Sequence, residues 1–507
     1  MTHHFDNAKG IVMEESRYIL ALDQGTTSTR ALAFSLDGAV LDTAQVALKQ
    51  HYPSLGWVEH DAEDIWQASQ MVMKTVIDRQ KILGKIPLTL GITNQRETVV
   101  AWDAKSGKPY TKAIVWQDRR TAKICESLVA DGHAPMVAEK TGLVLDPYFS
   151  ATKINWLLDE GGLRPLAEAG DLLVGTIESY LIYRLTKGKQ HITDLTNASR
   201  TMLCNIHTGV WDDDLLNLFN VPRAILPKIV ENIGDFGCVA NGLFGAGVPI
   251  NAAIGDQQSA AVGQGCIKQG MVKSTFGTGC FLLQNTGTKP IESNHKLLTT
   301  VAYSIDAVPK YALEGSIFNA GTVVQFFRDQ MSMIEEAEET EALARSVADT
   351  DGVYMVPAFT GLGAPHWLAE AKGMVCGLTR NTSKAHLVRA GLEAVVYQTY
   401  DLLDAFETDS GLQIKSLRVD GGMATNDWLM QYLSDILNIE VARPKSVETT
   451  AWGAALLAGL QCGVWKDLTA AVETWAAQSH FKPSMMGTDR NKALLGWHDA
   501  IKRLAPY

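Results

Sequence analysis

Two short turns rich in glycine and threonine are the clearest candidates for chemistry in this chain. The first is Asp23-Gln24-Gly25-Thr26-Thr27-Ser28 near the N-terminus, and the second is Phe276-Gly277-Thr278-Gly279-Cys280 past the middle. Glycines let neighbouring backbone N–H groups converge on one anion, and the hydroxyls beside them supply further donors. One such turn alone is more often an ordinary glycine turn. Two matched turns favour a duplicated phosphate-binding fold that grips one polyphosphate.

Strand-like segments flank both turns, so each reads as the tip of a β-hairpin. The first hairpin spans residues 18–22 and 29–34, and the second spans residues 271–275 and 281–284. Only the first turn carries an acid, Asp23, at its mouth. Mg²⁺ takes one or two protein carboxylates together with waters and phosphate oxygens. Asp23 is therefore the candidate ligand for Mg²⁺.

Polar residues follow three further strand-like segments, at the positions where α/β folds place their ligands. Residues 87–93 form an apolar strand that ends at Asn94-Gln95-Arg96-Glu97, and residues 250–254 end at Gly255-Asp256-Gln257. A third strand, 416–420, runs into Gly421-Gly422 and then a helix over 427–437. A Gly-Gly turn allows close backbone approach to a flat ligand such as adenine.

Length and composition set the frame for these motifs. A chain of 507 residues is too long for one core, and we place a domain boundary after Gly265, which gives domains 1–265 and 266–507. The net charge of -11 argues against nonspecific binding to nucleic acid or to an anionic membrane. Seven scattered cysteines without a C-x-x-C pair indicate reduced thiols in a cytoplasmic protein.

Several other classes of protein are disfavoured by the absence of their motifs. The sequence has no G-x-x-x-x-G-K-[ST] loop, no G-x-G-x-x-G fingerprint, no H-E-x-x-H pair and no G-x-S-x-G elbow. No run of residues is long and apolar enough for a membrane span. Residues 1–16 lack the apolar segment of a signal peptide, so we expect none. ATP, if it binds, does so without a P-loop.

Nine segments occur in the order and spacing found in the glycerol kinases. From about Tyr18 to the C-terminus the chain resembles that family of sugar and polyol kinases, which shares the actin, hexokinase and heat-shock ATPase core. The segments are ALDQGTTSTR, GITNQRET, VWQDRRT, DPYFSATKINWLLDE, TNASRTML, GDQQSA, FGTGCF, PAFTGLGAPHW and RVDGG. The resemblance implies an α/β fold with two ribonuclease-H-like (actin-like ATPase) domains flanking a deep catalytic cleft. It also implies ATP-dependent phosphorylation of glycerol to glycerol 3-phosphate in glycerol catabolism, with MgATP as donor, in a homodimer or homotetramer.

The resemblance assigns roles to residues at the base of the cleft. Asp256 corresponds to the general base that takes the proton from the attacking hydroxyl. The residues that would bind the glycerol hydroxyls are Arg96, Glu97, Tyr148, Asp256 and Gln257, and those that would cover its carbon face are Trp116 and Phe281. Simpler alternatives exist: Asp256 as a helix cap, Arg96 and Glu97 as an exposed ion pair, and Phe281 as ordinary core.

The resemblance also assigns the nucleotide site. Its phosphate-binding residues would be Thr26, Thr27, Ser28 and Arg30 of the first turn and Thr278 of the second. The residues that would line the adenosine end are Gly321, Gln325, Gly422, Met423 and Asn426.

Three segments depart from the family pattern. Leu368, within residues 363–373, replaces a carboxylate, and Glu178-Ser179-Tyr180 stands where Asp-Ser-Trp or Asp-Thr-Trp is usual. Residues 241–249 lack an arginine that helps some bacterial members bind fructose 1,6-bisphosphate, so we expect inhibition by that sugar to be weak or absent. Two other functions stay open: a kinase for another small polyol or ketose, and a nucleotide-driven filament or chaperone that hydrolyses ATP without a small acceptor.

Overall fold

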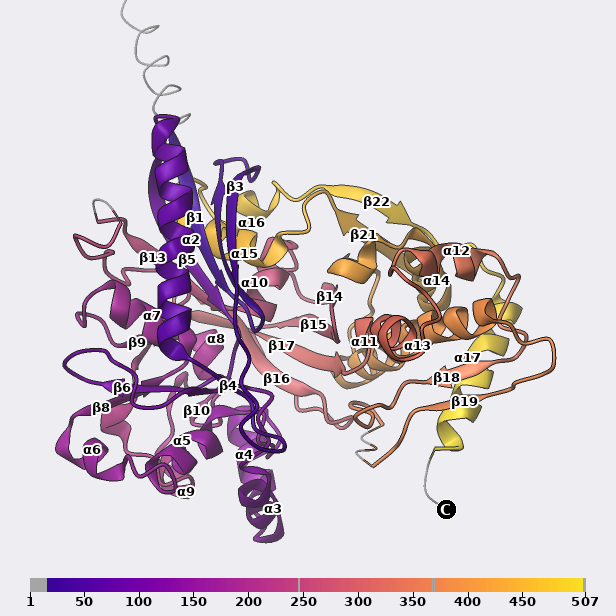
Figure 1. Cartoon of the computed structure of the whole chain (residues 1–507), viewed down its shortest axis with the longest axis horizontal. Helices are drawn as coiled ribbons and strands as arrows, with labels where there is room; N and C mark the ends of the chain where they lie inside the picture. The colour runs from indigo at the N-terminus through magenta and orange to yellow at the C-terminus, as the bar shows by residue number, and fades with distance from the viewer. Residues whose placement is uncertain (1–15, 245–246, 367, 369, 505–507) are drawn as a thin grey trace, which may run out of the picture.

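The computed structural model describes residues 16–244, 247–366, 368 and 370–504. It forms two lobes that lie side by side, each built around one large sheet (Figure 1). Some of the sequence predictions concern residues outside these ranges. The segment predicted to contain no signal peptide lies outside the described residues except for Ser16, and so do Gly245 and Ala246 of the 241–249 segment and Trp367 of the GAPHW motif.

The first lobe is built on a five-stranded sheet of order β13-β5-β1-β2-β3. The three strands β1, β2 and β3 form an antiparallel meander, and β5 and β13 continue the sheet in parallel with β1. The first Gly/Thr turn connects β1 and β2, so the predicted hairpin is confirmed. The strands are β1 (Arg17–Gln24), β2 (Ser28–Phe34), β3 (Val40–Ala47), β5 (Ile86–Asn94) and β13 (Ile250–Gly255).

The second lobe repeats this arrangement inside a seven-stranded sheet of order β16-β17-β15-β14-β20-β21-β22. The pairs β14–β15 and β15–β17 are antiparallel, and β14–β20 and β20–β21 are parallel, as for the corresponding strands of the first sheet. The predicted duplication is therefore confirmed. The strands are β14 (Val272–Phe276), β15 (Cys280–Gly287), β16 (Leu298–Ile305), β17 (Val308–Ile317), β20 (Ser416–Asp420), β21 (Glu440–Pro444) and β22 (Ala477–Phe481).

Helices cover both faces of the first sheet. Alternate residues of β1 point to opposite faces: Leu20 packs in the cluster with α2 (Ala62–Ile82), and Ile19 packs in the cluster with α15 (Thr449–Gln461). α2 is capped at its N-terminus, where the side chain of Asp61 accepts from the backbone N–H of Glu63 at 3.0 Å. In Figure 1, the yellow α15 lies beside the indigo strands although it belongs to the C-terminal half.

The contacts of α15 with the first sheet and with α10 are close because a glycine lies in each. A Cβ on Gly91 of β5 would lie 2.2 Å from the carbonyl oxygen of Ala454, and one on Gly453 would lie 1.9 Å from that of Ser259 in α10 (Asp256–Gly263). Larger side chains at these positions would push the elements apart. α15 packs on the first sheet although it lies far beyond residue 266 in the chain. The division into domains 1–265 and 266–507 therefore stays a prediction.

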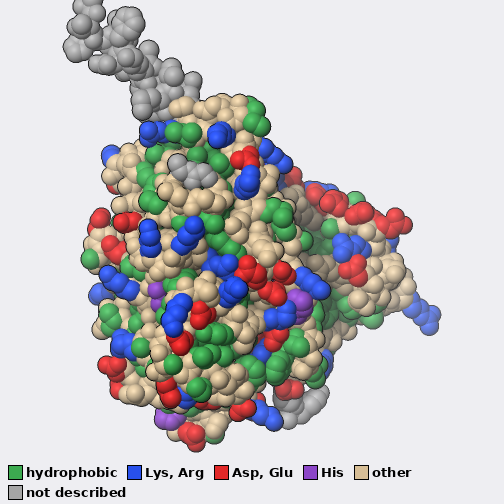
Figure 2. Space-filling view, turned by 60° about the vertical axis from the view of Figure 1, so that its left-hand side comes forward, with side chains coloured by type: hydrophobic (Ala, Val, Ile, Leu, Met, Phe, Trp, Pro, Cys, Tyr) green, Lys and Arg blue, Asp and Glu red, His purple; other side chains and the backbone are tan. Residues whose placement is uncertain are grey.

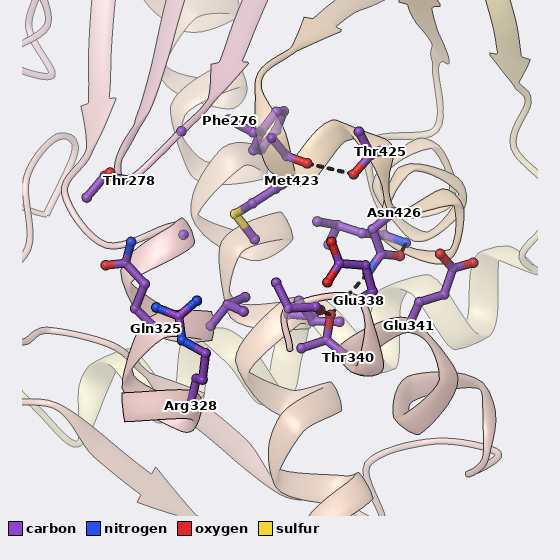
Figure 3. A pocket seen from close by; sticks show the side chains of 17 residues that line it. Phe276, Thr278, Gln325, Arg328, Glu338, Thr340, Glu341, Met423, Thr425 and Asn426 are labelled. Carbon is purple, nitrogen blue, oxygen red and sulfur yellow. Dashed lines mark hydrogen bonds between the residues drawn. The ribbon is translucent and has the colours of Figure 1, made fainter. Parts of the chain in front are cut away.

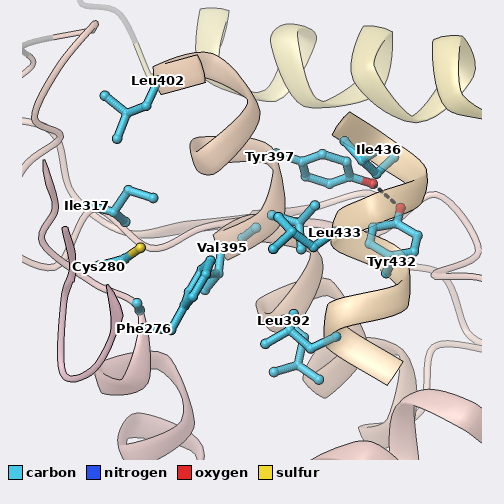
Figure 4. Packing of buried hydrophobic residues seen from close by; sticks show 14 of the residues in the cluster. Phe276, Cys280, Ile317, Leu392, Val395, Tyr397, Leu402, Tyr432, Leu433 and Ile436 are labelled. Atoms are coloured by element: carbon cyan, nitrogen blue, oxygen red, sulfur yellow. Dashed lines mark hydrogen bonds between the residues drawn. The ribbon is translucent and has the colours of Figure 1, made fainter. Parts of the chain in front are cut away.

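The core of the second lobe lies between its sheet and two long helices, α13 (Lys384–Ser410) and α14 (Asp427–Leu437) (Figure 4). The hydroxyls of Tyr397 and Tyr432 lie 2.7 Å apart and join these helices. Phe276 and Cys280, on either side of the second Gly/Thr turn, are both fully buried in this core. The packing therefore anchors the two strands from which the turn projects.

The remaining elements are smaller and surround the two sheets. In the first lobe they are β4 (Glu59–His60), β6 (Val100–Asp103), β7 (Ala113–Ile114), β8 (Leu172–Gly175), β9 (Ile192–Asp194), β10 (Cys204–Asn205), β11 (Val210–Trp211), β12 (Lys228–Val230), α3 (Ala122–Ala130), α4 (Ala134–Thr141), α5 (Ser150–Leu158), α6 (Arg164–Ala169), α7 (Ile177–Leu185), α8 (Leu195–Ala198) and α9 (Asp213–Leu218). In the second lobe they are α11 (Gly321–Gln325), α12 (Glu339–Arg345), β18 (Tyr354–Val356), β19 (Met374–Cys376) and α17 (Gly487–Lys502). The short α16 (Leu468–Val472) packs on α15.

The described residues also show the charges on one face of the molecule, the state of the cysteines and the character of the helices. On the face seen in Figure 2, acidic and basic side chains are interspersed, and no extended basic patch covers it. All seven cysteines are free thiols. Within the described ranges, no helix combines the length and the apolar character that crossing a membrane would require.

Candidate active site

Asp256 lies where β13 ends and α10 begins, at the carboxyl edge of the first sheet. Its Oδ1 accepts from the backbone N–H of Gln257 at 2.7 Å, and 29% of its side chain is exposed. Arg96, which follows the neighbouring strand β5, places its Nε 3.2 Å from the same oxygen. Asp256 is thus the first residue of a helix, and its carboxylate stays partly exposed with a guanidinium beside it.

Arg96 and Glu97 are buried, so the alternative of an exposed ion pair does not hold. Arg96 donates from Nη1 and Nη2 to the two oxygens of Glu314, at 2.5 and 3.1 Å. Arg200 donates from Nε to Glu97 at 2.7 Å and from Nη2 to Glu314 at 2.9 Å. Two arginines and two carboxylates therefore form one closed network, and Glu314 contributes to it from β17 of the other lobe.

The pKa values of Asp256 and Glu314 are shifted in opposite directions. Burial raises the pKa of Asp256 to about 6; the positive charge of Arg96 opposes this shift and the negative charge of Glu97 adds to it. Burial also disfavours ionised Glu314, but Arg200 and Arg96 outweigh it and lower the pKa of Glu314 to about 2. Near neutral pH, Glu314 is therefore a fixed charge, whereas Asp256 has the pKa of a base that can exchange protons.

Three aromatic side chains from separate elements stand together beside this network. The ring of Trp116, after β7, lies 5.5 Å from that of Tyr148 and 6.5 Å from that of Phe281, both edge to face. All three are partly exposed, so Phe281 of β15 is not simple core. Trp116 also donates from Nε1 to Oγ1 of Thr26 at 2.9 Å. The aromatic wall thus draws on both lobes and contacts the first Gly/Thr turn.

A buried polar layer supports the strand ends that carry Arg96 and Asp256. Asn94, the last residue of β5, donates to Glu178 at 3.0 Å, and the backbone N–H of Gly255 donates to Oγ1 of Thr196 at 2.9 Å. Burial, together with the negative charge of Asp194, raises the pKa of Glu178. The glutamate that replaces the usual aspartate at 178 therefore holds the end of β5 in place.

The first Gly/Thr turn is closed by a hydrogen bond from the backbone N–H of Gly25 to the carbonyl of Ser28 at 2.9 Å, and Thr27 at its tip is exposed. Arg30 joins Oδ2 of Asp23 at 2.5 Å and Oε2 of Glu448 at 2.7 Å. Oδ2 of Asp23 is therefore already paired with the positive charge of Arg30. This arrangement fits Mg²⁺ bound through water at Oδ1 of Asp23 rather than a direct all-protein site, and the described residues contain no group of three or more acidic, His or Cys ligands.

The second Gly/Thr turn sits against the start of α11. Its Gly277 N–H donates to the carbonyl of Gly279 at 2.9 Å, and the N–H of Gly321 donates to the carbonyl of Gly277 at 3.0 Å. A Cβ on Gly321 would lie 2.6 Å from that carbonyl oxygen, so only glycine fits there. Thr278 at the tip is exposed.

A cavity of about 410 Å³ opens beside this turn, within the size range of small-molecule sites (Figure 3). Figure 3 shows Met423 at its centre, with Thr278 and Gln325 on one side and Asn426 on the other. The six lining residues predicted from the sequence are Thr278, Gly321, Gln325, Gly422, Met423 and Asn426. The predicted Thr26, Thr27, Ser28 and Arg30 belong to the first lobe and do not line it.

Sequence reasoning missed other functional residues. Arg328, Glu338, Thr340 and Glu341 also line the cavity, and Asn426 donates to Thr340 at 3.4 Å. A signal existed for Glu314, since an acid in the middle of the apolar strand β17 needs a buried partner.

Two family models match successive parts of the chain. Residues 18–263 match the N-terminal domain of the FGGY family of carbohydrate kinases, and residues 272–462 match its C-terminal domain. The chain belongs to the FGGY family of carbohydrate kinases. Within this family, it is 52% identical over 492 residues to a glycerol kinase of Gluconobacter oxydans, covering 97% of this chain and 96% of that protein. It is 50% identical over 490 residues to a glycerol kinase of Ectopseudomonas mendocina, covering 96% and 99%.

Solved structures of FGGY kinases share the fold. The structure of Plasmodium falciparum glycerol kinase with ADP superimposes with a TM-score of 0.92 at 36% identity, covering 97% of this chain and 99% of that one. A ligand-bound xylulose kinase from Lactobacillus acidophilus superimposes with a TM-score of 0.87 at 21% identity, covering 96% and 98%. The second likeness concerns the fold alone. The two-lobed actin-like ATPase architecture predicted from the sequence is therefore confirmed.

Proposed function

We propose that this protein transfers the γ-phosphoryl group of ATP to glycerol, with Asp256 as the general base. The observation that carries the proposal is the position of Asp256: it is partly open at a strand end, 3.2 Å from Arg96, with its pKa raised to about 6. The glycerol kinases that are about half identical over nearly the whole chain support the choice of substrate.

Glycerol would lie between the charged network and the aromatic wall. Because Arg200 occupies Oε1 of Glu97, Oε2 would accept from a glycerol hydroxyl, and Arg96 and Gln257 would donate to another. Tyr148 adds a hydroxyl, and burial raises its pKa, which keeps it a donor. Trp116 and Phe281 would cover the carbon atoms, which a purely polar site would leave unrecognised.

The nucleotide would bind across both lobes. Its adenosine would occupy the cavity around Met423, and the two Gly/Thr turns would hold the phosphates through backbone N–H groups and the hydroxyls of Thr26, Thr27, Ser28 and Thr278. Asp23 would hold Mg²⁺ through water, and the ion would supply neutralisation of phosphate charge. Arg30, already beside Asp23, would add a positive charge on the phosphate side.

The chemical step needs mainly positioning and charge neutralisation. The glycerol hydroxyl gives its proton to Asp256 while its oxygen attacks the γ-phosphorus, and the bond from that phosphorus to the bridging oxygen of ADP breaks. The products are sn-glycerol 3-phosphate and ADP. Closure of the two lobes would exclude water that could otherwise accept the phosphoryl group.

Two further proposals concern the compartment and the oligomeric state of the enzyme. We infer a cytoplasmic homodimer or homotetramer; the free thiols support the compartment. Light scattering of the purified protein measures the assembly, and a monomer would contradict it.

The test is an assay of ADP release with ATP and a panel of polyols and ketoses. We expect glycerol to be preferred, and Asp256→Asn to lower kcat by about 10²- to 10⁴-fold with a similar KM for glycerol. Asp64→Asn, at an exposed acid of α2, is the matched control and should leave kcat unchanged. Preference for a four- or five-carbon substrate, ATP hydrolysis without any acceptor, or near-normal turnover of the Asp256 variant would each contradict the proposal.

A further inference from the structure

A buried lysine of the second lobe reaches into the candidate glycerol site. Lys273 lies in β14 and has no exposed surface. Its Nζ donates to Oε1 of Gln257 at 2.5 Å, to Oγ1 of Thr275 at 3.1 Å and to the carbonyl of Phe281 at 3.4 Å. The three N–H bonds of the ammonium group are thus matched by three acceptors.

All three acceptors are neutral, which is unusual for a buried ammonium. Among the described residues, no carboxylate oxygen lies within 4.0 Å of the Lys273 nitrogen. Burial therefore lowers the pKa of Lys273, although Asp420, Glu314 and Asp256 act against this at longer range. A buried charge without a direct ion pair destabilises a fold, so its presence here calls for a functional explanation.

The partners of Lys273 all belong to the proposed site. Gln257 follows the base and lies in α10 of the first lobe, Phe281 is part of the aromatic wall, and Thr275 precedes the second Gly/Thr turn. The contact with Gln257 therefore joins the two lobes beside the reacting hydroxyl.

The chemistry of the ammonium group fixes the orientation of the Gln257 amide. An ammonium only donates, so Gln257 must turn its oxygen toward Lys273. The NH₂ group of the amide is then the end that remains for a ligand. Without Lys273, the amide could rotate by 180° and offer an acceptor in place of the donor.

The charge of Lys273 also acts on the base. Burial raises the pKa of Asp256 and Glu97 adds to this shift, whereas Arg96 and, to a smaller extent, Lys273 lower it. Lys273 lies in β14, and Arg96 and Glu97 lie in the loop after β5; Glu314 and Arg200 of the network and the phenol of Tyr148 are their further neighbours. Lys273 is thus the cation that the second lobe contributes to the charge balance of Asp256.

We propose that Lys273 is a positioning residue for glycerol phosphorylation: it orients the Gln257 amide so that its NH₂ donates to a substrate hydroxyl, and its positive charge, held next to Gln257, favours the ionised form of the neighbouring Asp256. This inference rests on the proposed function. Lys273 does not itself touch the substrate; it acts through Gln257 and through its charge.

The test compares Lys273→Met, Gln257→Met and the double variant in steady-state assays with glycerol and ATP. Lys273→Met keeps the length of the side chain and removes both the donors and the charge. We expect it to raise the KM for glycerol by roughly tenfold, the size of one lost hydrogen bond, and to leave the KM for ATP within about twofold. The double variant should have the glycerol KM of Gln257→Met alone, because the two residues act in series.

The pH profile of kcat/KM tests whether the charge of Lys273 acts on Asp256, an effect that a merely structural role would not produce. Lys273→Met should move the acid limb of the profile upward by about half a pH unit or more, because a nearby positive charge is lost, whereas Gln257→Met should not move it. Additive effects on KM, an unmoved acid limb, or a raised KM for ATP instead would each overturn the inference. If Lys273→Met fails to fold by circular dichroism, Lys273→Gln, which keeps a donor but no charge, gives the same pH test.

The wild-type enzyme distinguishes this inference from the proposed function. If wild-type protein phosphorylates glycerol and the Lys273 variants behave like it, only the inference fails. If wild-type protein does not phosphorylate glycerol, the proposed function itself fails.

Discussion

Glu314→Gln should destabilise the protein strongly, because Glu314 neutralises both buried arginines of the site. Its side chain is 2% exposed, and it accepts from Arg96 at 2.5 and 3.1 Å and from Arg200 at 2.9 Å. The substitution keeps the shape of the side chain but removes its charge and turns one acceptor into a donor. Arg200 would then keep only Glu97, and Arg96 would keep the partly exposed Asp256 and, at 4.0 Å, Glu97.

The magnitude follows from the pKa of Glu314, which falls from 4.5 to about 2. At about 1.4 kcal/mol per pH unit, the folded state favours the ionised carboxylate by about 3 kcal/mol more than the unfolded chain does. Because the pKa is depressed in the folded state, this stability is fully present above pH 4.5 and is lost as the pH falls toward 2. Breaking a buried ion pair from one side costs about 3–5 kcal/mol, which agrees.

The assay is urea unfolding at pH 7, followed by tryptophan fluorescence. A two-lobed chain need not unfold in one step, so the midpoint of each transition is compared between variants. We expect a lower midpoint for Glu314→Gln and no change for Glu160→Gln, an exposed glutamate after α5. An unchanged midpoint for the Glu314 variant would refute the idea that this carboxylate holds the two arginines in place.

Four further predictions concern catalysis and ligands. The kcat/KM for glycerol should fall about tenfold per pH unit below about pH 6, because Asp256 must be ionised to act as base; a flat profile between pH 5 and 7 would exclude it. Trp116→Ala should raise the KM for glycerol by about tenfold with little change for ATP, and an unchanged KM would count against the aromatic wall. Gly321→Ala should raise the KM for ATP alone, because its Cβ would lie 2.6 Å from the Gly277 carbonyl; equal effects on both substrates would contradict this. Fructose 1,6-bisphosphate should inhibit weakly or not at all, since residues 241–249 lack the arginine, and strong inhibition in a steady-state assay would disprove it.

The local parts of the fold were predictable from the sequence. Both hairpins formed where strand-like segments flank a Gly/Thr turn, and the helix predicted over 427–437 coincides with α14. Local residue patterns decide these features, because a turn and its two strands are neighbours in the chain. The resemblance to the glycerol kinases also predicted residues that meet only in the folded chain, because six predicted nucleotide residues line one cavity.

The long-range pairings could not be predicted in the same way. Glu314 meets Arg96 across 218 residues of sequence, and Lys273 meets Gln257 across the two lobes. A single sequence indicates that a buried charge needs a partner but not which of many residues supplies it. The packing of α15 against the first sheet was missed for the same reason, because its apolar pattern fits a contact with either lobe.

The position of α15 has a consequence for biosynthesis. The last strand of the first sheet ends at Gly255, but the helix that covers one of its faces is complete only at Gln461, about 200 residues later. At about 5–20 residues per second, the ribosome needs roughly 10–40 s to make that stretch. During this time the nascent chain exposes an apolar surface that chaperones would have to shield. A fragment that stops before residue 449 would keep that surface open and should precipitate on expression.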